Sequence, residues 1–127
     1  TFFSYTYNTF ATSKDTIYLT EKTWKDIMCF HPFLLVSNSG SLKELKKLGY
    51  KTFSPHINAS YDDEEDFSKR SEMLLLEINR LCEMSKTQLL DWYASQADIL
   101  IHNFKHFVKS NPVKETINKI MELYKSL

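Results

Sequence analysis

The sequence has few cysteines, no long apolar run and no excess of charge of either sign. Its 127 residues include two cysteines, Cys29 and Cys82, which lie far apart and without a partner motif. That usage favours a reducing compartment over a disulfide framework and predicts two buried thiols. No apolar run approaches the roughly 20 residues that a helix needs to cross a bilayer, and no secretory signal peptide opens the chain. We therefore expect a cytoplasmic protein with no transmembrane segment.

The balance of charge argues against a protein that binds nucleic acid. Lysine plus arginine and aspartate plus glutamate each number 16, so the formal net charge at pH 7 is +0. Without an overall positive field we expect no nucleic-acid partner, and any phosphate site must be local. The sequence also lacks a Walker loop, a serine elbow and a cysteine–histidine pair that spacing could support. We therefore name no catalytic residue in this chain.

The remaining composition suits a single globular domain. Hydrophobic residues make up 43% of the chain, which is enough for one core at this length. The pattern is α/β over residues 1–61 and helical over residues 62–127. Because the first residue is threonine and residues 1–7 already resemble a strand, we expect the chain to be a fragment of a longer one.

Local signals place five elements in the α/β part. Thr20 is a predicted N-cap, Ser41 and Glu44 form a predicted capping box, and Gly49 stands where a helix ends in the left-handed conformation. The apolar run 33–36 is typical of a strand covered on both faces. The expected elements are a strand at 1–7, a helix at 21–30, a strand at 33–36, a helix at 41–48 and a strand at 50–53.

The helical part opens on five consecutive acids at residues 62–66. We favour a solvated helix N-terminus over a paired-metal site, because metal ligands must converge from spaced positions. Ser85 and Gln88 form a second capping box, which predicts one helix to about residue 109. Helices are expected at 66–83, 86–109 and 112–127, the last with an apolar stripe of Val113, Ile117, Ile120, Met121 and Tyr124.

Two histidines, His102 and His106, stand four residues apart on the predicted helix. This spacing can place two imidazoles on one metal ion, but no third ligand can be identified. We therefore favour a surface or packing role for both and predict no metal site.

The strongest candidate for ligand binding is Glu21 with Lys22, at the start of the first predicted helix. A lysine ammonium beside free backbone N–H groups suits a diphosphate, and a neighbouring carboxylate can accept two hydrogen bonds from a ribose diol. Equally open is a structural role, in which Glu21 stabilises the helix dipole and Lys22 is solvated. The turn 37–41, with Gly40 and Ser41, is a second anion candidate, and a plain loop is an equal alternative there.

The segment from residue 17 to residue 66 resembles a known family. Thr20-Glu21-Lys22, followed by a helix and the strand Phe33-Leu34-Leu35-Val36, is similar to the C-terminal donor-binding domain of GT-B glycosyltransferases of the fucosyltransferase-like type found in bacteria and their phages. Further matches are His31-Pro32-Phe33, Gly40-Ser41-Leu42 and the segment 48–53. The resemblance implies that Glu21 holds the ribose of a nucleotide sugar and that Lys22 meets its diphosphate, with Thr20, Gly40 and Ser41 beside them.

The resemblance also implies a fold and a function for the whole chain. The expected fold is a Rossmann-like half domain with a short, mostly parallel sheet and an all-helical C-terminal tail. The chain would bind a nucleoside diphosphate sugar without a metal cofactor, and the acceptor site and general base would lie on a missing N-terminal domain. A separate hypothesis is a non-catalytic helical module whose tail, residues 66–127, docks a protein partner through its apolar stripe.

Overall fold

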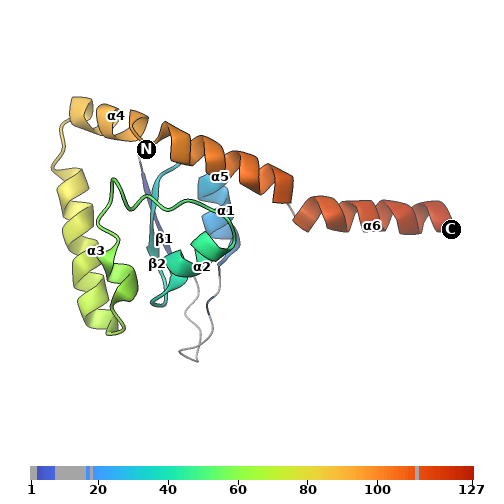
Figure 1. The fold of residues 1–127 in the computed structure, drawn as a ribbon, viewed down its shortest axis with the longest axis horizontal. Helices are drawn as coiled ribbons and strands as arrows, with labels where there is room; N and C mark the ends of the chain where they lie inside the picture. Colours follow the sequence, from blue (N-terminus) through green and yellow to red (C-terminus); the bar gives the residue numbers. More distant parts are fainter. Residues whose placement is uncertain (1–2, 8–16, 18, 111) are drawn as a thin grey trace.

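The computed structural model describes residues 3–7, 17, 19–110 and 112–127. In these residues lie six α-helices and two β-strands, arranged as shown in Figure 1. Most of the described residues lie in helices and eight lie in strands, so this part of the protein is mostly helical. The predicted α/β class with a Rossmann-like half domain is therefore wrong: the described residues contain a single sheet of two parallel strands.

The sheet pairs β1 (Ser4–Tyr7) with β2 (Phe33–Val36). The strands are parallel, with Ser4 opposite Phe33 and Tyr7 opposite Val36, and the chain between them contains α1 (Glu21–Met28). All four residues of β2 are buried, as expected for a strand covered on both faces. Residues 1–2 of the predicted first strand lie outside the described residues.

The predicted third strand, residues 50–53, is irregular. The side chain of Asn103, which is 1% exposed, explains the difference. Its Oδ1 accepts the N–H of Lys51 at 2.8 Å, and its Nδ2 donates to the Lys51 carbonyl at 2.8 Å. A helix side chain thus satisfies both backbone groups that a neighbouring strand would have bonded.

Three predicted signals at helix ends have different outcomes. Gly49 has φ +92°, which confirms the predicted left-handed end of α2 (Ser41–Lys47). The predicted capping box at Ser41 and Glu44 is wrong, because Gly40 is the N-cap residue and Ser41 is already helical. Thr20 stands at the N-cap of α1 as predicted, but its side chain makes no capping hydrogen bond.

The helical part begins with a 3₁₀ turn, η1 (Ser60–Asp63), and α3 (Phe67–Cys82). It continues through three further helices: α4 (Lys86–Ala94), α5 (Ala97–Ser110) and α6 (Pro112–Ser126). The capping box of Ser85 and Gln88 is confirmed at the start of α4.

The single helix predicted from 86 to 109 is broken between α4 and α5. Two side chains at the break bond to the same carbonyl oxygen of Trp92: Ser95 Oγ at 2.6 Å and Gln96 Nε2 at 2.9 Å. Such side-chain bonds compete with the backbone ladder and favour a helix end.

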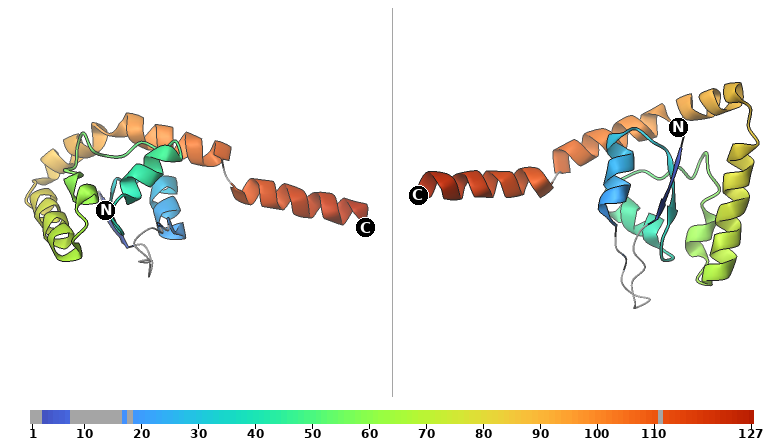
Figure 2. Two further views of the ribbon diagram at one scale, coloured as in Figure 1. Left: turned by 60° about the horizontal axis from the view of Figure 1, so that its bottom comes forward. Right: turned by 180° about the vertical axis from the view of Figure 1, so that it is seen from behind.

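Helices cover the sheet on two sides. In Figures 1 and 2, α3 lies along one face, α1 lies on the other, and α4 and α5 run across one end. α1 also packs against α5, where the rings of Trp24 and Phe107 stack with centroids 6.1 Å apart. α6 projects away from the rest of the molecule, and all of its residues whose side chains are described are exposed. No helix in the described part of the chain is long and apolar enough to cross a membrane.

Both cysteines are free and exposed, so the prediction of buried thiols is wrong. Cys29 is the C-cap residue of α1, and Cys82 is the last residue of α3. At the end of α3 the buried position belongs to the neighbouring Leu81, which has 0% exposure.

Candidate functional site

Glu21 and Lys22 occupy the first turn of α1, and both side chains are exposed. Thr6 of β1 bonds to Asp26 of α1, and the earlier Ser4 lies beside His31, which follows α1, so α1 runs antiparallel to β1. The first turn of α1 therefore lies toward the carboxyl end of the parallel β1–α1–β2 unit. In open α/β sheets, ligands bind outside the carboxyl ends of the strands. The two residues with the strongest ligand-binding pattern therefore stand where a ligand can reach them.

Lys22 also lines a hollow of about 450 Å³ between α1 and β1, which we call the basic groove. From α1 it is lined by Lys22, Lys25 and Asp26; the last two stand three and four residues after Lys22, so all three lie on one side of the helix. Residues of β1 and of the turn after α1 complete the lining. The full lining is Ser4, Tyr5, Thr6, Lys22, Lys25, Asp26, Cys29 and His31.

Two polar contacts join β1 to Asp26 and His31, which also line this groove. Thr6 Oγ1 donates a hydrogen bond to Asp26 Oδ2, and Ser4 Oγ lies 3.3 Å from Nδ1 of His31. Asp26 is thereby held against the strand, whereas Lys22 and Lys25 are exposed. The charged side chains that line the groove are the ammonium groups of Lys22 and Lys25 and the carboxylate of Asp26. Their net positive charge favours the binding of anionic groups.

The second predicted anion site, at Gly40 and Ser41, already holds an anion from the protein itself. The carboxylate of Asp62 accepts the N–H of Leu42 at 2.9 Å and the N–H of Lys43 at 3.2 Å. The Asp62 carbonyl accepts the N–H of Gly40 at 2.8 Å. These groups of the N-terminal turn of α2 are therefore engaged by Asp62.

Gly40 and Ser41 have structural contacts at this turn. Ser41 is 1% exposed, and its Oγ donates to the Asn38 carbonyl at 2.6 Å. A Cβ atom on Gly40 would stand 3.6 Å from Cδ1 of Ile17, so the turn lies beside the chain that leads into α1. The structure thus places the second candidate near the first, with its helix end engaged by Asp62.

Asp62 also corrects the prediction of a fully solvated acidic run. Burial raises the pKa of Asp62 above its ordinary value of 3.8, although the N–H groups of Leu42 and Lys43 act in the opposite direction. Asp63 is exposed and pairs with Lys43 at 2.6 Å, which lowers the pKa of Asp63. Asp66 is the N-cap of α3 and accepts the N–H of Lys69. No periodicity in the sequence separates the buried Asp62 from its acidic neighbours.

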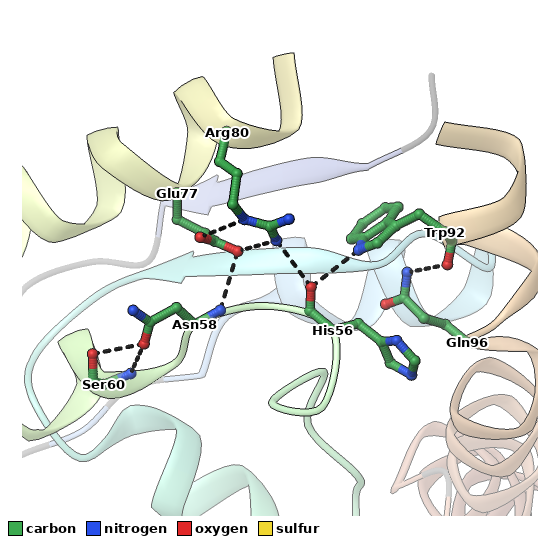
Figure 3. A network of polar contacts seen from close by, with 7 residues as sticks. All are labelled: His56, Asn58, Ser60, Glu77, Arg80, Trp92 and Gln96. Atoms are coloured by element: carbon green, nitrogen blue, oxygen red, sulfur yellow. Dashed lines mark hydrogen bonds and ion pairs between the residues drawn. The ribbon is translucent and has the colours of Figure 1, made fainter. Parts of the chain in front are cut away.

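A second polar cluster, shown in Figure 3, holds the loop around His56 against α3 and α4. The His56 carbonyl accepts Nε1–H of Trp92 at 3.0 Å and Nη2–H of Arg80 at 3.1 Å. Glu77, 5% exposed, accepts the Asn58 N–H at 3.1 Å and pairs with Arg80 at 2.5 Å. Burial alone would raise the pKa of Glu77, but its bonds to Arg80 and Asn58 lower it below its ordinary value. The sequence carried no signal for this cluster, which positions the loop and α3 relative to each other.

His102 and His106 have the packing role that we favoured. His102 Nε2 lies 3.0 Å from the Gly49 carbonyl oxygen, and His106 Nε2 lies 2.7 Å from that of Leu48. The two imidazoles donate to the carbonyl groups at the C-terminal end of α2, which fastens α2 to α5. Across the described residues, no three side chains of the metal-binding types gather at one point.

Comparisons with protein-family models, with curated proteins and with solved structures found no match to this chain. The features that bear on function are therefore the motif of residues 20–22, its place at the start of α1 and the groove beside it.

Proposed function

We propose that this chain binds the nucleoside diphosphate of an activated sugar, as the donor-binding part of a glycosyltransferase. The observation that supports this proposal is the position of Glu21 and Lys22. Both are exposed in the first turn of α1, at the carboxyl end of a parallel β1–α1–β2 unit. That position combines backbone N–H groups, a positive helix end, an ammonium group and a carboxylate.

In this proposal each residue has a chemical role. Lys22 binds the diphosphate and stabilises the negative charge that develops on it as the sugar departs. Glu21 accepts hydrogen bonds from the ribose diol, and Thr20 lies beside it at the N-cap. Gly40 and Ser41 contribute no anion-binding groups in this proposal, because Asp62 engages the end of α2 and Ser41 is 1% exposed. The positive groups of α1 act without a metal ion.

The remaining parts of the reaction belong to a separate domain in this proposal. The acceptor site and the general base lie on an N-terminal domain that faces the donor site. We place the protein in the cytoplasm, a compartment that suits the two free thiols of Cys29 and Cys82.

A calorimetric titration with nucleoside diphosphates tests the proposal. We expect saturable, weak binding, and Lys22→Ala should weaken it about tenfold because a charge-assisted contact is lost. Glu21→Ala should remove the preference for a ribonucleotide over its 2′-deoxy form. Matched controls are Lys46→Ala and Glu72→Ala, both at exposed positions outside α1. The absence of saturable binding, or equal binding by the Lys22→Ala variant, would contradict the proposal.

A second candidate function, docking of a protein partner through α6, is favoured by the exposed apolar residues of that helix. Ile120, Met121, Leu123 and Tyr124 are all more than half exposed. A 15-residue helix whose described side chains are all exposed is marginally stable in water, so burial of its apolar face would stabilise it. Light scattering should then show association that rises with concentration, is unaffected by nucleotide and is lost in Ile120→Glu but kept in Lys125→Glu. A monomer at all concentrations would exclude self-association through α6.

A further inference from the structure

The C-terminal half of α6 and the residue after it present one apolar face. Each of its apolar residues has another three or four positions away, so they lie on one side of the helix. They are Ile120, Met121, Leu123, Tyr124 and Leu127, all more than half exposed. Because α6 projects away from the rest of the molecule (Figures 1 and 2), a large surface could reach this face.

The lysines of α6 stand at the two edges of this apolar face. Lys125 stands four positions after Met121 and eleven positions, about three helix turns, after Lys114, so both lysines lie at one edge. Lys119 stands four positions before Leu123 and lies at the other edge. All three lysines are exposed, and positive charge therefore borders the apolar face on both sides.

Glu122 lies on the side of α6 opposite to the apolar face. It stands three positions after Lys119 and three before Lys125, in the middle of the polar side, and it is exposed. A lysine at the edge of an apolar face can bury its stem and extend its ammonium group to anionic groups beside that face. The apolar side of α6 thus attracts negative charge, while its acid stays in water.

This arrangement of charges distinguishes between possible occupants of the face. A protein groove that accepted the face would need acidic side chains along both of its rims. An anionic bilayer surface supplies negative charge on every side of an inserted helix, and the cytoplasmic leaflet carries such lipids. Tyr124, in the apolar face, has the amphipathic ring that is enriched at membrane–water interfaces. The bilayer surface therefore matches α6 with the fewest further requirements.

We propose that α6 binds the surface of an anionic membrane, with its apolar face at the level of the acyl chains and Lys114, Lys119 and Lys125 beside lipid phosphates. The helix would lie in the plane of the surface. Binding would be reversible, because one short amphipathic helix buries a limited apolar area. The proposed nucleotide site is on α1, so this inference does not depend on it.

Co-sedimentation of the full chain with lipid vesicles tests the proposal. We expect saturable binding to vesicles of phosphatidylcholine and phosphatidylglycerol in equal parts, and about tenfold weaker binding to phosphatidylcholine alone. Helicity measured by circular dichroism should rise with the mixed vesicles, because burial of the apolar face stabilises α6. No binding to the mixed vesicles, or equal binding to both kinds, would overturn the proposal.

Paired variants locate the binding surface on α6. Leu123→Gln should weaken binding to the mixed vesicles about tenfold, whereas Ser126→Gln, at an exposed position on the polar side, should not. Lys125→Gln should weaken it about fivefold, and Glu122→Gln should not weaken it. Leu123→Gln should titrate with a nucleoside diphosphate like the wild type. Equal effects within either pair, or self-association of the chain without binding to vesicles, would overturn the proposal.

Discussion

The carboxylate of Asp62 accepts the backbone N–H of Leu42 at 2.9 Å, and so a residue of η1 satisfies the N-terminal end of α2. The two residues are 20 positions apart in the sequence. Because Gly40 and Lys43 also donate to Asp62, this one residue fixes the turn that follows β2. The contact holds η1 and α2 together and determines what the end of α2 can bind.

Replacement of Asp62 by alanine should destabilise the protein by about 1–3 kcal/mol, because the N–H groups of Leu42 and Lys43 lose their acceptor. Asp62→Asn should cost less, since its amide oxygen can still accept one bond. Urea denaturation followed by circular dichroism measures both values. Equal stability of the alanine variant and the wild type would show that water replaces the carboxylate at no cost.

The neighbours Asp62 and Asp63 should affect the pH dependence of stability in opposite directions. The folded pKa of Asp62 is raised, so its contribution is fully present below the ordinary value of 3.8 and is lost as pH rises through the folded pKa. The folded pKa of Asp63 is lowered by Lys43, so its contribution is present above 3.8 and is lost as pH falls through the folded pKa.

Denaturation over a series of pH values tests these signs. As pH falls from neutrality, the wild type should gain stability relative to Asp62→Asn and lose stability relative to Asp63→Asn. Parallel curves for the two variants would contradict the assignment.

Tyr61→Phe should destabilise the fold by about 1–3 kcal/mol, because a buried N–H loses its acceptor. The Tyr61 hydroxyl oxygen accepts the N–H of Leu35 at 3.1 Å, on the edge of β2 that faces away from β1. Burial raises the pKa of this hydroxyl, so it stays protonated at neutral pH. Tyr124→Phe, at a side chain that is 74% exposed, is the matched control. Equal denaturation midpoints for the two variants would mean that the Leu35 bond adds nothing.

Gly49→Ala should cost more than Gly40→Ala, although both glycines have positive φ. A Cβ on Gly49 would stand 2.7 Å from the His106 ring, whereas the nearest atom to a Cβ on Gly40 is 3.6 Å away. We expect about 1 kcal/mol from backbone strain at Gly40 and at least about 2 kcal/mol at Gly49. Thermal denaturation compares them, and adding His106→Ala to Gly49→Ala should recover the steric part. Equal losses at the two glycines would argue against the clash.

Glu77→Gln should destabilise the cluster around His56 by about 1–2 kcal/mol, because Arg80 loses its charged partner while the amide oxygen still accepts the Asn58 N–H. The folded pKa of Glu77 is lowered, so its contribution is present above the ordinary value of 4.5 and is lost on acidification through the folded pKa. The difference between wild type and variant in urea should therefore shrink at low pH. Glu72→Gln, at an exposed position of α3, is the control, and a pH-independent difference would contradict the sign.

Features of the fold that depend on neighbouring residues could be predicted from the sequence. The buried run of β2 and the capping box of Ser85 and Gln88 follow from short patterns. The left-handed Gly49 and the packing role of His102 and His106 were also correct. For β2, the capping box and Gly49, the deciding residues stand within one short segment. For the two histidines, only their general role could be predicted, because their partners Gly49 and Leu48 are 53 and 58 positions away.

Features that depend on distant partners could not be predicted. Residues 50–53 have the composition of a strand, but Asn103, 52 positions away from Lys51, takes the place of a neighbouring strand. Asp62 looks like any acid of its run until α2 is placed beside it. For the candidate site, the sequence identified Glu21 and Lys22 but not the groove, because β1 and α1 form it together.

The bridge between Asn103 and Lys51 has a consequence for the order of folding. Since its partners are 52 positions apart, closing this loop costs more chain entropy than forming any local helix turn. We expect the βα segment and the helices to form before this contact, and residues 50–53 to become ordered only when α5 docks. A single amide side chain would then bring residues 50–53 into place late in folding.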